Sequence, residues 1–189
     1  VGLSMALGAF LAGMMLAARA RAAAHDHAAI GLARSAIAAY PNSIAPRLLL
    51  GALYHERKRY KDAEPAWVEA GRRFPEHVGV ALELGFCREQ IGDLDGAVAA
   101  LRSALERDPG NPRALNSLGY LLADHGQKLD EARDMIARAL AGDPQNGAIV
   151  DSMGWVYYRL GRFAEARTEL ERAVAMTEGD PVVREHLGD

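Results

Sequence analysis

A glycine that returns at a nearly constant interval restricts the fold of this sequence more than any other feature. Each of these glycines follows a leucine or methionine, and the intervals are 34, 34, 35 and 34 residues: Gly51, Gly85, Gly119, Gly154 and Gly188. Two alanine series and one proline series repeat in the same phase, beginning at Ala63, Ala70 and Pro75. Self-similarity with a period of about 20–50 residues is the signature of a protein built from stacked repeats.

The residues around each glycine indicate what one repeat is made of. Apolar side chains stand immediately before the glycine and three residues after it, as Leu118 and Leu122 do, and this spacing lies on one face of a helix. Small residues in a helix interior let a second backbone come close. Proline cannot continue the preceding helix. Each repeat is therefore predicted to be two helices joined by a turn, and the chain to be all-α.

This pattern resembles the tetratricopeptide repeat, a pair of antiparallel helices of about 34 residues with small residues at the crossing and proline at the exit. The resemblance implies a right-handed solenoid over residues 25–189. Its four full units would be residues 44–77, 78–111, 112–146 and 147–180, with partial units at 10–43 and 181–189. The third inner turn is one residue longer, which explains the interval of 35. The stub from Pro181 lacks the second helix of its unit, and we expect it to fray.

The apolar segment of residues 1–24 has three interpretations. Residues 1–18 carry no charged side chain, which is close to the lower limit of about 17–25 residues for a membrane span. The segment also fits a signal-peptide remnant ending near residues 22–24, or the first helix of the incomplete first repeat. We favour membrane association, which implies a membrane or periplasmic location in a bacterium over a cytoplasmic one. The sequence lacks an initial methionine and stops within a repeat, so we expect a fragment.

Several small motifs contain residue types that are also found in reactive or metal sites. The D-x-D-G of residues 93–96 lacks the other ligands of a calcium loop, and His25-Asp26-His27 lacks a third ligand, so both are interpreted as turns. Ser117 and Ser152 recur because the repeat recurs, and neither lies in a nucleophile elbow. We predict no catalytic residue, no cofactor and no metal.

Charge and cysteine content limit the function further. The net charge of −3 argues against a nucleic-acid binder, which would show a basic face. Cys87, the single cysteine, occupies a position that other repeats fill with leucine or valine, so a buried apolar role is predicted for it.

The residue after each glycine points away from the second helix, because it is rotated about 100° around the first helix. These positions hold Ala52, Phe86, Tyr120 and Trp155. In the resembled family the first helices line a concave face, so the resemblance implies an aromatic peptide groove, although Phe86 also suits a seam between repeats. With neighbours at helical spacing, the candidate groove residues are Phe86, Glu89, Arg113, Asn116, Tyr120, Asp151, Trp155, Tyr158 and Arg159.

The family subclass that clamps a peptide C-terminus with Lys, Arg and Asn is poorly matched. Leu48, Leu82 and Asp151 stand where its Lys and Asn would be, and Asn116 and Arg113 alone suit it. We therefore predict a non-enzymatic scaffold that binds a peptide or protein segment in the concave groove. The alternative is a membrane-anchored envelope assembly factor that uses residues 1–18 together with this groove.

Overall fold

The computed structural model describes residues 27–177 and 180–188, and within these ranges every regular element is a helix. The chain divides between Phe74 and Pro75 into two compact units, each of which is described by itself. The apolar segment of residues 1–24, and His25 and Asp26 of the metal motif, lie outside the described residues. Among the helices that are described, none combines the length and the apolar character that a membrane span requires.

The first unit contains a helix over residues 27–39 followed by the pair α2 (Ala45–Glu56) and α3 (Tyr60–Arg73). Gly51 of α2 lies directly against the indole of Trp67 on α3, where a Cβ at the glycine would come within 2.4 Å of the ring. Arg34 of the preceding helix donates a hydrogen bond of 2.9 Å to the Tyr54 hydroxyl of α2. The unit is thus held by an aromatic core between the paired helices and a polar contact to the helix before them.

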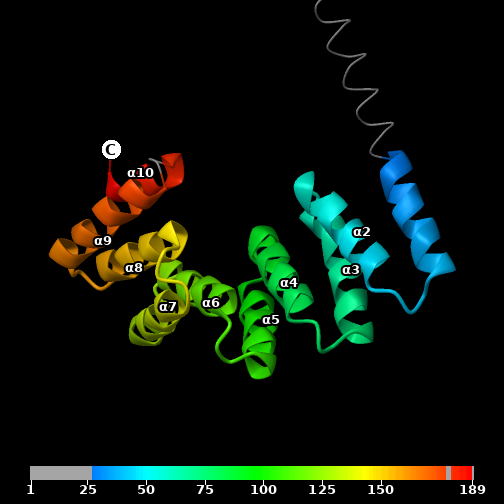
Figure 1. Cartoon of the computed structure of the whole chain (residues 1–189), viewed down its shortest axis with the longest axis horizontal. Coiled ribbons are helices and arrows are strands. Elements are labelled where there is room, and N and C mark those ends of the chain that lie inside the picture. Colours follow the sequence, from blue (N-terminus) through cyan, green and yellow to red (C-terminus); the bar gives the residue numbers. More distant parts are fainter. Residues whose placement is uncertain (1–26, 178–179, 189) are drawn as a thin grey trace, which may run out of the picture. The chain divides into compact units, whose positions relative to one another are not determined.

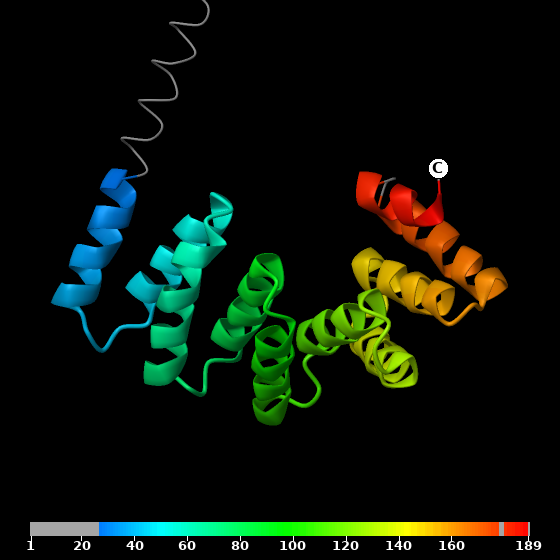
Figure 2. The same cartoon turned by 180° about the vertical axis from the view of Figure 1, so that it is seen from behind.

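The second unit consists of successive helix pairs (Figures 1 and 2). The pairs α4–α5, α6–α7 and α8–α9 make the most extensive contacts, each first helix packs on the next, and α10 packs on α9 and α8. This confirms the predicted all-α repeat architecture. The bounds are α4 (Val78–Ile91), α5 (Leu94–Arg107), α6 (Pro112–Asp124), α7 (Leu129–Gly142), α8 (Gly147–Arg159), α9 (Phe163–Met176) and α10 (Pro181–Leu187).

The residues between the helices explain where the helices begin and end. The Asn111 side chain accepts a hydrogen bond from the Ala114 amide at 3.0 Å, and Pro112 occupies the first turn of α6, where no amide proton is needed. Gly92 ends α4 with a φ of 84°, a conformation that L side chains rarely adopt. The corner between α6 and α7 comprises residues 125–128, and the corner between α4 and α5 only residues 92–93.

In α2, α4, α6 and α8 the repeating glycine lies where the two helices of a pair cross, whereas Gly188 ends α10 with a φ of 93°. A Cβ at Gly119 would be 2.9 Å from the carbonyl oxygen of Ala132, and a Cβ at Gly154 would be 3.2 Å from the amide nitrogen of Leu170. These contacts involve backbone atoms of the second helix, which cannot move aside as a flexible side chain can. Glycine in a helix costs about 0.5–1 kcal/mol relative to alanine, and this close approach is the physical reason for its recurrence.

Ala97→Leu is expected to lower the free energy of unfolding by about 1–3 kcal/mol, because Ala97 is fully buried in the α4–α5 crossing and a leucine would overpack it. Chemical denaturation followed by helical circular dichroism would measure the change. The control is Gln127→Ala in the exposed corner before α7, which should stay within about 0.5 kcal/mol. Equal and small changes in the two variants would contradict the repeat register.

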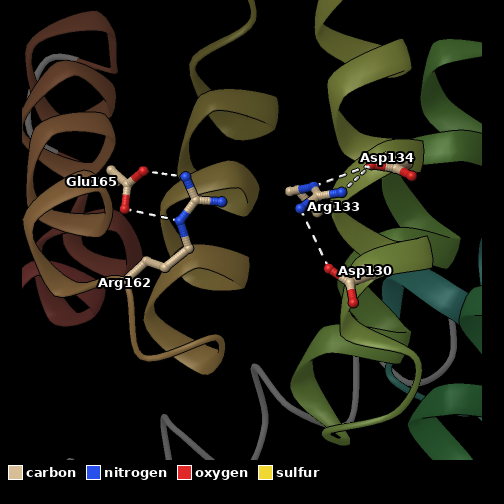
Figure 3. Close-up of polar contacts among 5 residues, drawn as sticks. All are labelled: Asp130, Arg133, Asp134, Arg162 and Glu165. Atoms are coloured by element: carbon tan, nitrogen blue, oxygen red, sulfur yellow. Dashed lines mark hydrogen bonds and ion pairs between the residues drawn. The ribbon is translucent and has the colours of Figure 1, made fainter.

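Ion pairs on α7 and at the start of α9 are local (Figure 3). Arg133 Nη2 lies 2.8 Å from Asp134 Oδ1, and its Nη1 lies 3.3 Å from Asp130 Oδ1. Arg162 Nε donates to Glu165 Oε2 at 2.8 Å, and its Nη2 contacts the other carboxylate oxygen. Solvent-exposed pairs of this kind are each worth about 0–1 kcal/mol. They therefore stabilise the turns of single helices and leave the packing of the pairs to the apolar core.

Candidate functional site

The first helices α4, α6 and α8 bring candidate residues together around one cavity of about 470 Å³, which we call the central pocket. Five sequence-predicted residues line it: Phe86, Glu89, Asn116, Tyr120 and Asp151. Gln90, Asp124, Ser117 and Ser152 also line it, and α10 adds Val182 and His186 at the rim. The position of each residue relative to the repeat glycine thus predicted which side chains of three different repeats lie on one surface.

A second cavity of about 680 Å³ lies between α8, α9 and α10, and we call it the end pocket. Trp155 and Tyr158 line it, with their rings stacked at a centroid distance of 5.3 Å, and Phe163 meets Tyr158 edge to face at 5.7 Å. The sequence predicted one continuous aromatic row. The structure divides that row, with Phe86 and Tyr120 in the central pocket and Trp155 and Tyr158 in the end pocket.

His186 of α10 separates the two cavities and lines both. Its ring stacks on Trp155 at 4.8 Å between centroids, and its Nδ1 lies 2.9 Å from each carboxylate oxygen of Asp151. Asp151 is consequently only 7% exposed, whereas the sequence placed it on the open side of α8. The carboxylate lines the central pocket, and α10 partly covers it.

The helix α10 is packed, although fraying was expected from Pro181 onward. Val183 is buried against Val150 of α8 and Ala173 of α9. Asp180 caps the helix by accepting a hydrogen bond from the Val182 amide at 2.8 Å. The sequence argument considered only the missing second helix of the unit, and the preceding pair supplies an apolar surface that α10 covers.

The candidates Arg113 and Arg159 line neither cavity. Arg113 Nη2 donates to Glu83 Oε1 at 2.7 Å, which connects α6 to α4. Arg159 Nη1 donates to the backbone carbonyl of Asp124, which connects α8 to α6, and the guanidinium lies 5.8 Å from the Trp155 ring centroid. Both arginines hold neighbouring first helices together.

Three carboxylates line the central pocket, and they affect the pKa of other side chains in its lining. Burial raises the pKa of Glu89, the imidazole of His125 opposes this effect, and the nearby carboxylate of Asp124 adds to it. Burial, followed by the carboxylates of Asp124, Asp151 and Glu89, raises the pKa of Tyr120 to about 12. Tyr120 therefore keeps its hydroxyl proton at neutral pH, and the pocket has a negative potential.

The serine beside Asp151 takes part in the hydrogen bonding of its own helix. Ser152 is buried, and its hydroxyl donates to the carbonyl of Ala148 at 2.9 Å. Cys87 is buried as the sequence predicted. Across residues 27–177 and 180–188, no cluster of three or more His, Cys, Asp or Glu side chains is arranged to hold a metal ion.

Sequence reasoning missed Gln90, Asp124 and His186 as pocket residues. A signal for His186 was present, because it stands two residues before Gly188, and Ser117 and Ser152 stand at the same position in earlier repeats. Gln90 and Asp124 share another register position, five residues after their glycines. Extending the register to these two positions would have found all three.

The docking of α10 is expected to weaken as the pH rises. The hydrogen bond to Asp151 raises the pKa of His186 against the opposing effect of burial, and the charges of Asp151, Glu185 and Asp124 add to the rise. A raised pKa in the folded state stabilises α10 fully below the unfolded value of about 6.5, and this contribution is lost as the pH climbs through the raised pKa. Hydrogen-exchange protection factors of residues 181–187 would measure it.

Asp151→Asn is the control for this pH dependence, because it removes the carboxylate that holds the imidazolium. Its protection factors should change little over the same pH range. Equal pH dependence in the wild type and in this variant would contradict the assignment to the His186–Asp151 pair.

Comparison with known proteins identifies the family. One tetratricopeptide repeat model matches residues 88–147 and a second matches residues 121–185, so that together they span more than half of the chain. The chain belongs to the tetratricopeptide repeat (TPR) family. Among curated proteins, this TPR chain is 37% identical over 129 residues to the TPR repeat-containing protein PA4667 of Pseudomonas aeruginosa, a match covering 67% of the chain and 22% of the relative. It is 31% identical over 115 residues to the BBSome complex member bbs-4 of Caenorhabditis elegans, covering 56% of the chain and 24% of that protein.

Solved TPR structures share the fold of the chain. MamA superposes with a TM-score of 0.70 at 22% identity, over 84% of this chain and 86% of that one. The thermophilic TPR protein TTC0263 of Thermus thermophilus also gives 0.70, at 20% identity, over 92% and 94%. YrrB gives 0.68 at 20% identity, over 87% and 84%. The chain spans about a quarter or less of the length of these two curated relatives.

Proposed function

We propose that this TPR chain is a non-enzymatic interaction scaffold that binds an extended segment of a partner protein along α4, α6 and α8. The observation that carries the proposal is the Asn116 amide in the central pocket. Its Oδ1 is buried and has no hydrogen-bond partner among the described residues. A buried acceptor left without a donor costs about 1–3 kcal/mol, and an amide N–H of a bound peptide would supply the donor.

The surroundings of Asn116 support a peptide ligand. Phe86 is 36% exposed and Tyr120 half-buried, so both keep ring surface available beside the amide. Aromatic side chains beside polar groups are enriched where binding energy concentrates. The cavity volume of about 470 Å³ lies within the range of about 300–1,000 Å³ that is typical of ligand pockets. YrrB, whose fold the chain shares, is described as a TPR protein with an unusual peptide-binding site.

The C-terminal clamp remains a poor description of this groove. Arg113, the one basic residue that suited it, is paired with Glu83 outside the central pocket. A free peptide carboxylate would meet Glu89, Asp124 and Asp151 instead of cations. The proposed ligand is therefore an internal segment or a segment with a blocked terminus.

A random dodecapeptide library selected on the full chain would test the proposal, with hydrogen exchange used to locate the bound peptide. Protection is expected in α4, α6 and α8 around Asn116. The second helix α7 serves as the internal reference, because none of its residues lines the central pocket. Protection confined to α7, or a selection that yields no binding peptide, would overturn the proposed groove.

The uncharged run of residues 1–18 favours a second candidate, a membrane-anchored assembly factor in which the groove works beside a bilayer. Cell fractionation of the full chain and of a chain that starts at residue 25 separates the two candidates. Membrane anchoring requires the full chain in the membrane fraction and the shortened chain in the soluble fraction. A full chain that stays in the soluble fraction would eliminate the anchor.

A further inference from the structure

We infer that the central pocket accepts a lysine or arginine side chain of the bound segment, an inference that rests on the proposed function. Three carboxylates converge on this cavity from three successive first helices: Glu89 on α4, Asp124 on α6 and Asp151 on α8. Three successive repeats therefore contribute one carboxylate each to the central pocket, and the side chain proposed to occupy it carries the opposite charge.

The negative charge of the pocket is compensated only in part. His186 pairs with Asp151, and Arg159 comes within 3.9 Å of the Asp124 carboxylate from outside the cavity. Among the described residues that line the central pocket, none is a lysine or an arginine. The basic group that lowers the pKa of Glu89 is the imidazole of His125. A ligand cation would complete this arrangement.

The acidic groups of the pocket suit a hydrogen-bond donor. An ionised carboxylate only accepts hydrogen bonds, and the buried Asn116 Oδ1 is an acceptor whose partner is absent from the described residues. An ammonium group carries three donors and a guanidinium group five, and neither carries an acceptor. Three acidic side chains beside an amide oxygen that lacks a donor therefore favour a basic side chain over a carboxylate.

The apolar wall of the same cavity suits the rest of such a side chain. Phe86 and Leu101 line it from the α4–α5 pair, and Tyr120 lies beside them. The methylene stem of lysine or arginine packs on apolar surface while its charged end reaches polar groups. Aromatic faces also attract cations through their negative quadrupole. The pocket thus offers separate surfaces to the stem and to the head of one residue.

His186 provides an internal example of this selectivity. It is the one basic side chain at the rim, and it lies on Trp155 with Nδ1 at the Asp151 carboxylate. The acidic surroundings raise the pKa of this imidazole, which means that they favour its cationic form. The neighbouring carboxylates Glu89 and Asp124 act on a ligand cation in the same direction.

The test uses peptides selected on the full chain and changes one charge at a time. Each lysine of a bound peptide is replaced by norleucine, which keeps the four-carbon stem, and each arginine by citrulline, which keeps the length of the side chain. Both replacements remove the charge. Fluorescence anisotropy of the labelled peptides gives Kd. One such replacement is expected to weaken binding to the wild type at least about tenfold, with a smaller loss in high salt.

Two protein variants then locate the cation. In Glu89→Gln the loss caused by the neutral peptide should shrink to about threefold or less, because the two changes remove the same interaction. Glu83→Gln is the matched control, since Glu83 is on α4 as well but pairs with Arg113 and does not line the central pocket. It should keep the full tenfold loss. Asp124→Asn replaces Glu89→Gln if circular dichroism shows that the latter has lost helix.

The possible outcomes are distinct. Selected peptides that protect α4, α6 and α8 but bind equally well with norleucine or citrulline would overturn this inference and leave the proposed function standing. A tenfold loss that is the same in the wild type and in Glu89→Gln, or in the Asp124→Asn variant that replaces it, would place the cation elsewhere and overturn the inference as well. A selection without any binding peptide removes the proposed function itself.

Discussion

Met153→Ala is expected to lower the free energy of unfolding by about 2–5 kcal/mol, among the largest single effects of the substitutions considered. Met153 is 5% exposed and belongs to the main core cluster of the second unit, with Leu118 and Val156. Truncation removes apolar burial and leaves a cavity that the helices on both sides cannot fill. Urea denaturation followed by circular dichroism measures the difference in unfolding free energy.

Met135→Ala is the matched control, because it removes the same atoms from the edge of the same cluster. Met135 is only partly buried on α7, so water and neighbouring side chains can occupy the space that it leaves. Its loss of stability should be clearly smaller. A Met153→Ala variant that is no less stable than Met135→Ala would show that residue 153 does not face the core.

Tyr120→Ala is expected to weaken the binding of a selected peptide at least about tenfold while the helical content stays intact. Tyr120 lines the central pocket, and the carboxylates of Asp124, Asp151 and Glu89 act on its hydroxyl. Truncation of an aromatic anchor commonly costs about 2 kcal/mol or more of binding, which is roughly thirtyfold in affinity. Fluorescence anisotropy gives the affinity, and circular dichroism reports the fold.

Phe163→Ala is the control for this loss, because Phe163 is 64% exposed and lines the end pocket but not the central pocket. Its affinity for the same peptide should equal that of the wild type. If the two variants bind equally well, Tyr120 carries no binding energy and the central pocket loses its main aromatic anchor.

Trp155 tests the groove less cleanly than the sequence indicated. The sequence places Trp155 in the peptide groove, which predicts that Trp155→Ala weakens binding and leaves the fold intact. In the structure the indole lies between Tyr158 and His186, and it packs against the main core cluster. Its removal is therefore expected to loosen α10 as well, so that Tyr120→Ala separates binding from folding better.

The stretch DSMGW, residues 151–155, shows how far the sequence alone reaches. The repeat register determined that Met153 faces the core and that Gly154 lies at the helix crossing, because helical periodicity fixes the face of each residue. It also indicated that the serine is architectural, since Ser117 stands at the same position one repeat earlier. The period, the helix pairs and the small residues at the crossings are all encoded within single repeats.

Tertiary structure alone decided which of these faces meet. Asp151 and His186 are 35 residues apart, and their contact depends on the angle at which α10 packs on α8 and α9. The same holds for Arg159, whose guanidinium is held by the backbone of Asp124 in the preceding repeat. Periodicity assigns a side chain to a side of its own helix, but the distance to another repeat follows from packing angles and rotamers. For this reason the sequence predicted an aromatic groove, and only the packed helices divided it into an acidic central pocket and a separate end pocket.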